Sequence, residues 1–433
     1  MTQSLLNNFS RRDLLKLSAA GALGTSSAGW FDALAGQAAA SAIARSKAKS
    51  CILLWMGGGP AQTDTFDMKP GHENAGEFKP IQTNVSGIEI CEHLPMMAKQ
   101  ADKLAILRGM STGEADHFRG SYLMQSGYRS IAATSHPNFG SIASMELGDA
   151  DFELPNFFWM GTAPAAGVGY LNARHSPFRI DNVREEMHQN IECVQPSGGY
   201  PVFDRRMSML NHMEQGFQGR QLGAKVVADH RDIYTQAARM MRSSKLDAVD
   251  LRSEPKKVRE SYGNSEFGKR CVLARRLIEV GVKFVGINSG LDWDTHNNNW
   301  SRMKPHFPII DQAWSALLTD LENRGLLQDT LVIWMGEFGR DPKINNKNAN
   351  AGREHYARAW TTVLSGAGIK TGQVIGRTSQ DGSTVEERPI SPIDYMATLS
   401  KILDIDDSKE NSTPDGRPIR IVETGATPVA ELF

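Results

Sequence analysis

The sequence predicts an α/β fold built on a mostly parallel central sheet between helices. Three short apolar runs support this prediction, because each is rich in strand-forming residues and stops at a polar loop that contains glycine: residues 51–56, 282–287 and 331–335. A strand that is apolar along its whole length is covered on both faces, as strands of parallel sheets are. Ligands of open α/β sheets collect outside the carboxyl ends of the strands, so the loops after these runs are candidate sites.

The chain opens with a segment, residues 1–45, that we interpret as an export signal. Arg11 and Arg12 precede a weakly apolar stretch rich in alanine and glycine, which Asp32 interrupts. This pattern is typical of a twin-arginine signal and not of a membrane span. The alternative, an amphipathic first helix, fits poorly with so many glycines. We therefore expect a periplasmic or extracellular protein with one α/β domain over residues 46–433 and no membrane span after signal removal.

The first half of this domain alternates strands and helices. After the first strand, a helix is expected over residues 94–101 and a second strand over 104–108, an order that fits a parallel sheet. The next helix begins near Phe118 and stops at Gly127, since glycine commonly ends helices in the left-handed conformation. Another helix is expected to begin at Ser135, with a proline in its first turn.

The second half holds a helical insertion and the remaining sheet elements. Residues at about 204–262 are polar, helical in pattern and rich in methionine and charge, and we expect them to pack over the site or beside it. Apolar spacing predicts the other elements: helices over residues 270–280, 309–321 and 394–403, and strands over 157–160 and 360–366.

Composition and cysteine usage exclude several classes of protein. The formal net charge is −1 and no block of like charges occurs, so nothing points to nucleic acid or to a polybasic membrane contact. The four cysteines (Cys51, Cys91, Cys193 and Cys271) lack zinc-finger spacing, which leaves buried thiols or one or two disulfides. Cys51 and Cys271 lie in apolar segments, where a buried thiol is favoured.

Carboxylates and histidines follow the three apolar strands. Asp64 comes after the first strand, Asp294 and His296 after the second, Glu337 directly after the third, and His355 at the end of the next loop. Imidazole and carboxylate groups together form the ligand set of zinc, iron or manganese. Any one of these carboxylates could be a solvated loop residue, but their arrival together favours a metal site over a Ser-His-Asp triad.

Five separated motifs resemble, in order, a bacterial family described as domain of unknown function 1501. They are the arginine pair at 11–12, residues 58–60 with 64–67, residues 293–296, residues 336–340 and residues 352–355. The resemblance covers nearly the whole mature chain. It implies membership of the alkaline phosphatase-like superfamily, with sulfatases and cofactor-independent phosphoglycerate mutases. It also implies their fold, with a metal site at the strand ends.

The resemblance assigns metal ligands residue by residue. His355 looks like the superfamily's last histidine ligand, Asp294 with His296 like its aspartate-and-histidine segment, and Glu337 like its late strand-end aspartate. Two departures stand out: glycine follows the first strand where members carry aspartate, and Phe338 follows Glu337 where an aspartate is often paired with histidine or asparagine. Asp64 would have to replace the first aspartate, so a two-metal, a one-metal and a degenerate site all stay open. We expect Asp294, His296 and His355 to bind one metal ion, with Asp64 and Glu337 either as ligands of a second ion or as hydrogen-bond acceptors that orient the imidazoles.

Two further chemistries find no support in the sequence. Type I sulfatases convert a cysteine or serine in a C/S-x-P-x-R segment, and neither any cysteine nor any serine of this chain lies in one. The glycine turn at 57–59 is not followed by a P-loop lysine, which argues against nucleotide binding by that route.

We therefore expect an exported hydrolase of phosphate or sulfate esters that uses a divalent metal ion, zinc, manganese or calcium, on a small-molecule or glycan ester. The metal would polarise the ester oxygen while Arg340 or Arg353 holds the anion. The alternative is an exported binding or scaffold protein on a degenerate fold. The missing first aspartate favours that alternative, whereas the surviving acidic, histidine and arginine residues of the motifs argue against it.

The resemblance also points to a nucleophile. Counting back ten residues from Gly127 reaches His117, the position at which sulfatases carry their reacting group at the start of a helix. A helix N-terminus can hold an anion and lower the pKa of an imidazole. Ser111 and Thr112 at the end of the preceding strand are the competing nucleophiles. The simplest alternative is that His117 caps the helix or bonds a neighbouring loop.

Overall fold

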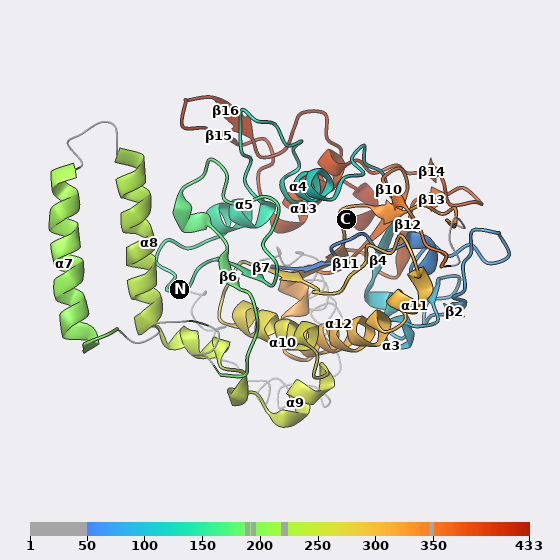
Figure 1. Cartoon of the computed structure of the whole chain (residues 1–433), viewed down its shortest axis with the longest axis horizontal. Helices are drawn as coiled ribbons and strands as arrows, with labels where there is room; N and C mark the ends of the chain where they lie inside the picture. The colour runs from blue at the N-terminus through green and yellow to red at the C-terminus, as the bar shows by residue number, and fades with distance from the viewer. Residues whose placement is uncertain (1–49, 187–190, 192–195, 218–223, 346–349) are drawn as a thin grey trace, which may run out of the picture. The chain divides into compact units, whose positions relative to one another are not determined.

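The main sheet, in the part of the chain that the structure describes, has eight strands in the order β12-β4-β11-β8-β1-β7-β5-β6 (Figure 1). The structure is a computed structural model, and it describes residues 50–186, 191, 196–217, 224–345 and 350–433. The expected signal and Cys193 lie outside these residues. The sheet strands are β1 (Ser50–Trp55), β4 (Ala105–Met110), β5 (Phe157–Met160), β6 (Phe178–Ile180), β7 (Phe284–Asn288), β8 (Thr330–Met335), β11 (Trp360–Gly366) and β12 (Gln373–Ile375).

The strand pairing confirms the mostly parallel sheet. The five strands from β8 to β6 pair in parallel, and β12 pairs in parallel with β4. Strand β11 runs antiparallel to both of its neighbours, β4 and β8. Strands β8, β1 and β7 are therefore adjacent and point the same way, so their carboxyl ends meet at one edge of the sheet.

Helices cover both faces of the sheet (Figure 1). On one face lie α3 (Pro95–Ala98), α10 (Glu266–Glu279) and α12 (His306–Asn323); on the other lie α4 (His117–Ser126), α5 (Phe139–Glu146) and α13 (Pro392–Leu403). Alternate residues of β1 divide between the two faces. Ile52 and Leu54 join a core with Trp314 of α12, whereas Leu53 joins one with Leu399 of α13. All of these side chains are buried, as a parallel strand with two covered faces requires.

Local capping explains where the helices begin and end. The carboxylate of Asp116 accepts a hydrogen bond from the backbone N–H of Arg119 at 3.0 Å, which starts α4, and Gly127 ends it in the left-handed conformation with φ 79°. Helix α5 begins later than expected, at Phe139 and not near Ser135. Its cap is Asn138, whose side chain accepts a hydrogen bond from Gly140 N at 2.8 Å. The expected start was wrong because serine and asparagine are both strong helix caps and lie three residues apart here.

The helical insertion consists of α7 (Gly199–Phe217) and α8 (Ala224–Arg242), followed by the short α9 (Lys256–Ser261). Helix α8 packs against the segment before β6: Asp229 accepts a hydrogen bond from Ala173 N at 3.2 Å, and Asp232 accepts one from the Asn172 side chain at 3.1 Å. These contacts place α8 beside the β6 end of the sheet.

Smaller elements complete the described chain: α11 (Asn299–Met303) and the two-stranded sheets β2 (Pro80–Gln82) with β3 (Glu89–Cys91), β9 (Gly339–Arg340) with β10 (His355–Tyr356), β13 (Arg377–Thr378) with β14 (Val385–Glu387), and β15 (Glu410–Ser412) with β16 (Pro418–Arg420). Of the cysteines in this part of the chain, Cys51, Cys91 and Cys271 are buried free thiols. None of the helices described here combines the length and hydropathy needed to cross a bilayer.

Candidate metal centre

The strand-end loops bring four of the predicted site residues to one edge of the sheet. Asp294 and His296 lie in the loop after β7, Glu337 lies just after β8, and β10 carries His355 beside its β9 partner Arg340. A residue expected as a nucleophile joins them, because His117 is the first residue of α4.

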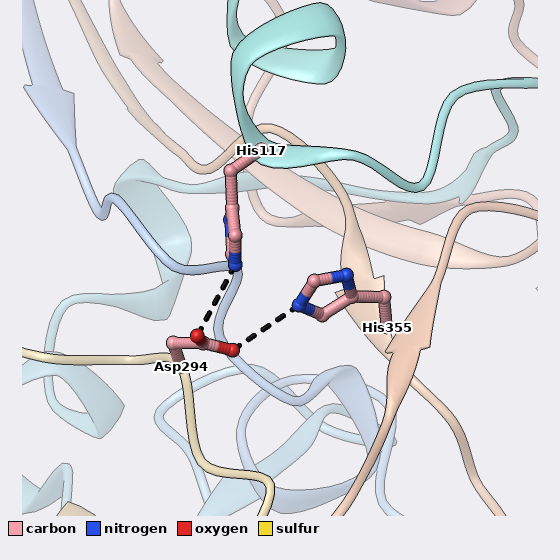
Figure 2. A group of neighbouring side chains, drawn as sticks. All are labelled: His117, Asp294 and His355. Atoms are coloured by element: carbon pink, nitrogen blue, oxygen red, sulfur yellow. Dashed lines mark hydrogen bonds and ion pairs between the residues drawn. The ribbon is translucent and has the colours of Figure 1, made fainter.

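The carboxylate of Asp294 lies at the centre of this group (Figure 2). Its Oδ1 lies 2.9 Å from Nε2 of His296 and 3.2 Å from Nε2 of His355. Its Oδ2 lies 3.3 Å from Nε2 of His117. The Nε2 atoms of His296 and His355 are themselves 3.0 Å apart. Three imidazoles therefore direct the same ring nitrogen toward one carboxylate.

The opposite ring nitrogen of each imidazole fixes its tautomer. Nδ1 of His355 lies 2.7 Å from the carbonyl oxygen of Ala115, and a carbonyl oxygen can only accept, so this Nδ1 carries the proton. Nδ1 of His296 likewise lies 2.5 Å from the Glu354 carboxylate. When both imidazoles are neutral, the Nε2 lone pairs of His296 and His355 point at each other and at Oδ1 of Asp294. Nothing in this trio can donate a proton, so a cation between the three atoms would relieve the repulsion.

The third imidazole follows the same rule. Nδ1 of His117 lies 2.7 Å from Oε1 of Glu337, which also accepts a hydrogen bond from Gly58 N at 2.9 Å. Nε2 of His117 is shielded from solvent without a hydrogen-bond partner, and so is Oε2 of the buried Glu337. A buried polar atom without a partner is costly, which marks the position as one that a bound group would complete.

The spacing of the donor atoms fits a metal ion. Ligand atoms at zinc–nitrogen distances in a tetrahedron lie about 3.3 Å apart. The distances among His296, His355 and Asp294 are 2.9 to 3.2 Å. The donor atoms of His117, Asp294 and His355 also lie within 4.8 Å of one another. Histidines that bind metals usually donate their other N–H to a carboxylate or a carbonyl oxygen, as His117, His296 and His355 do here.

The charges around Asp294 keep it ionised. Partial burial raises the pKa of Asp294, but the hydrogen bond and charge of Arg340, with His117 and His296, outweigh burial and lower the pKa to about 2. Burial lowers the pKa of His355, and the charges of Arg340 and His117 act in the same direction. The hydrogen bond to Glu337 instead raises the pKa of His117, against the effect of burial. An ionised carboxylate beside a neutral His355 is the protonation state that metal binding requires.

Arg340 ties the site loops together. Its guanidinium is fully buried and donates to Asp294 Oδ1 at 2.5 Å, to the carbonyl oxygen of Gly59 at 3.1 Å and to that of Arg353 at 3.2 Å, as well as to that of Gly58. Because these donors are already engaged, the geometry assigns Arg340 to positioning Asp294 and not to holding a substrate anion.

Two glycines allow the loops to approach so closely. Gly58 has a φ of 110°, and a Cβ there would lie 2.6 Å from the backbone nitrogen of Asp294. A Cβ on Gly352 would overlap the carbonyl oxygen of His296. Any larger residue at either position would push apart the loops that carry the ligands.

Asp64 and Arg353 lie outside this group. Both side chains are fully buried, and Asp64 Oδ2 lies 2.7 Å from Arg353 Nε. The Asp64 carboxylate also accepts hydrogen bonds from Asn299 at 2.8 Å and from Trp300 at 3.1 Å. Its lone pairs are therefore occupied, and the Arg353 guanidinium is out of reach of solvent. Asp64 therefore bonds core residues where a metal ligand was expected, and Arg353, expected to hold the substrate anion, is occupied by Asp64.

Ser111 and Thr112 line a separate cavity, whose lining includes none of the four residues His117, Asp294, His296 and His355. The Thr112 hydroxyl donates to the carbonyl oxygen of Glu114 at 3.3 Å.

Sequence reasoning missed two of the groups that orient the imidazoles, Glu354 and the carbonyl of Ala115. Glu354 precedes His355 in the chain but bonds His296, and the acceptor for His355 is a backbone carbonyl on a distant loop. The sequence signal for Glu354 was its place inside the Gly352–His355 motif. No side-chain pattern could reveal the Ala115 carbonyl.

A family model confirms the sequence resemblance, and solved structures show low similarity to the chain. Among solved structures, the chain is similar to a mutant TAB5 alkaline phosphatase with Mg bound, at 14% identity over 83% of this chain and 99% of that chain with a TM-score of 0.37. It is also similar to a sulfatase from Pseudoalteromonas sp., at 10% identity over 89% of this chain and 73% of that chain with a TM-score of 0.40. No curated protein matches the chain. The model of the family described as protein of unknown function (DUF1501) matches residues 48–433. The chain therefore belongs to the DUF1501 family.

Proposed function

We propose that this protein is a metal-dependent hydrolase of phosphate or sulfate esters, with a divalent ion held by His117, Asp294, His296 and His355. The observation that carries the proposal is the convergence of three Nε2 atoms on one carboxylate while each Nδ1 is taken by an acceptor. Three nitrogen donors with one carboxylate favour zinc or manganese over calcium, which prefers a shell of oxygen atoms.

The residues around the ligands would hold the site ready for this chemistry. Glu337 orients the imidazole of His117, and Glu354 orients that of His296. Arg340 holds the Asp294 carboxylate in place through a hydrogen bond. The four ligand side chains are 23 to 39% exposed, so a dissolved ester can reach them. A divalent ion supplies Lewis acidity toward an ester oxygen and makes water nucleophilic at neutral pH.

We propose a ligand role for His117 in place of the expected attack on the substrate. Its Nδ1 is bonded to Glu337, and its Nε2, which has no hydrogen-bond partner, faces the Asp294 carboxylate at 3.3 Å, as the donor atom of a metal ligand would. Ser111 and Thr112 remain to be tested by single alanine substitutions, with turnover compared at equal metal occupancy.

Metal content and turnover of the purified full-length protein test the proposal together. We expect one ion per chain by elemental analysis and hydrolysis of an aryl phosphate or an aryl sulfate, with both lost in His355→Ala. His230→Ala is the matched control, because His230 also bonds a glutamate, Glu214 at 2.6 Å, but lies on the helical insertion. A His355→Ala protein that retains its metal would overturn the assignment.

The same measurements separate the hydrolase from an exported binding or scaffold protein. Metal without turnover of either ester class, or of glycan esters, would favour the scaffold. The observation that favours the scaffold is the ion pair between Asp294 and Arg340, because it neutralises the carboxylate without a metal.

We also propose export through the twin-arginine pathway to the periplasm or the cell exterior. The support is the Arg11–Arg12 pair ahead of a small-residue stretch.

A further inference from the structure

A cavity of about 720 Å³ lies beside the segment that carries His117. Gly113, at one wall, precedes His117 by four residues, which span at most about 14 Å of chain. Leu123 and Gly127, at another wall, belong to α4 or follow it directly. The cavity and the candidate metal centre thus share the loop and the helix that place His117.

The cavity is positively charged. Arg129, Arg417 and Arg420 line it, against one carboxylate, that of Glu423. In the described chain, no ion pair or hydrogen bond joins the Arg417 or Arg420 guanidinium to another residue, whereas exposed Arg377 is paired with two glutamates. Nε of Arg420 is shielded from solvent and has no acceptor. Arg129 is paired with Glu114 at 3.8 Å, and the charges of Arg417 and Arg420 act on Asp415 and Asp406, but neither of these two guanidinium groups has a carboxylate within ion-pair distance in the described chain. Guanidinium groups that line a cavity without a direct ion-pair partner are suited to an incoming anion.

The cavity has a rigid, uncharged wall next to these arginines. The rings of Tyr128 and His136 stack in parallel at 4.3 Å, and the backbone N–H of His136 donates to the Tyr122 hydroxyl at 2.5 Å. Burial lowers the pKa of His136, and the charge of Arg417 lowers it further, so the neutral imidazole leaves the positive charge of the cavity to its arginines. Hydroxyl groups of Ser111, Thr134 and other residues supply hydrogen-bonding partners around the cavity.

We propose that this cavity binds the carboxylate or sulfate group of an acidic saccharide, through Arg417 and Arg420. The volume lies in the range of small-molecule sites and exceeds what a free inorganic anion needs, and the hydroxyl lining suits a polyhydroxylated ring. That this saccharide is part of the substrate rests on the proposed hydrolase function. The substrate would then carry a second anionic group away from the ester that is cleaved.

The test is direct binding to the full-length protein by isothermal titration calorimetry, with D-glucuronate and D-glucose as probes, because they differ in a carboxylate against a hydroxymethyl group. We expect measurable binding of glucuronate, at least tenfold tighter than of glucose. In the Arg417→Gln and Arg420→Gln double variant, the preference should fall at least tenfold, since each guanidinium provides charge-assisted hydrogen bonds. Arg377→Gln, on a separate two-stranded sheet, is the control and should bind as the parent does.

The two proposals fail in different ways. His355→Ala should keep glucuronate binding, so loss of metal or of turnover there speaks only to the hydrolase. Equal binding of the two sugars, no binding of either, or undiminished binding by a folded double variant would overturn the saccharide site. If turnover is found, the double variant should raise KM for an anionic saccharide ester and leave kcat unchanged.

Discussion

Substitution of the two glutamates that orient the imidazoles tests the metal centre at its most specific point. Glu337→Gln and Glu354→Gln keep an oxygen that can accept from Nδ1 of His117 and His296, but they remove the negative charge. A histidine whose Nδ1–H points at an anion is a stronger metal ligand than one bonded to a neutral amide. Such partners typically contribute 10- to 100-fold to metal affinity.

The burial of the two carboxylates sets the expected order. Glu337 is 2% exposed and Glu354 is 47% exposed, so solvent screens Glu354 far more. We therefore expect Glu337→Gln to lower Zn²⁺ affinity about 100-fold and Glu354→Gln about tenfold. These factors correspond to about 2.7 and 1.4 kcal/mol.

The assay is competition of each variant with a chromophoric zinc chelator at neutral pH, after thermal unfolding has confirmed that the variant is folded. Glu386→Gln, an exposed glutamate paired with Arg377, serves as the control and should leave affinity unchanged. Unchanged affinity in Glu337→Gln, or a larger loss in Glu354→Gln than in Glu337→Gln, would refute the reasoning from tautomer and burial.

Three further outcomes follow from the sequence and the structure. Replacing Arg11 and Arg12 by lysine should retain the protein in the cytoplasm, which cell fractionation and immunoblotting would show; unchanged export would contradict the signal. Gly352→Ala should abolish metal binding, since its Cβ would overlap a carbonyl oxygen of the ligand loop, whereas Gly167→Ala, with open space around its Cβ, should bind as before. Glu254→Gln should destabilise the fold by about 1–3 kcal/mol in denaturant unfolding, because it removes the buried charge that pairs with Arg276 and Arg275, although Arg275 keeps its ion pairs with two other carboxylates. Burial raises the pKa of Glu254, but the hydrogen bonds and charges of Arg275 and Arg276 outweigh burial and lower the pKa. The stabilisation by Glu254 is therefore fully present above about pH 4.5 and is lost as the pH falls through the folded pKa. Between these two values the free energy of unfolding should fall less in the variant than in the parent protein.

The sheet was largely predictable because its strands carry their signal locally. The expected strand over residues 331–335 is β8 (Thr330–Met335), and the strand over 360–366 has the observed bounds of β11. The antiparallel direction of β11 was not predictable, since direction depends on which neighbours a strand pairs with. The later start of α5 reflects a choice between two good caps within four residues.

The candidate site was harder to predict because its contacts cross the chain. Proximity to the first strand end suggested Asp64 as a ligand, but a short 3₁₀ turn over Gln62–Asp64 tucks the side chain into the core against Arg353. His117 was identified by its position in a helix, yet its partner Glu337 lies 220 residues further on. Residue type and spacing identified the edge of the sheet at which the site lies, and only the folded chain shows which atoms face each other.

The separate origin of the ligands has a consequence for how related chains can diverge. His117, His296 and His355 each come from a different loop, strand or helix end, and their side chains are 23 to 39% exposed. Loss of one histidine should thus abolish the proposed metal binding while leaving expression, solubility and cooperative unfolding almost intact. Asp294 is the exception, because its loss would leave the buried Arg340 without its carboxylate. Family members without the proposed metal centre are therefore expected to lose histidines first and to keep the aspartate longest.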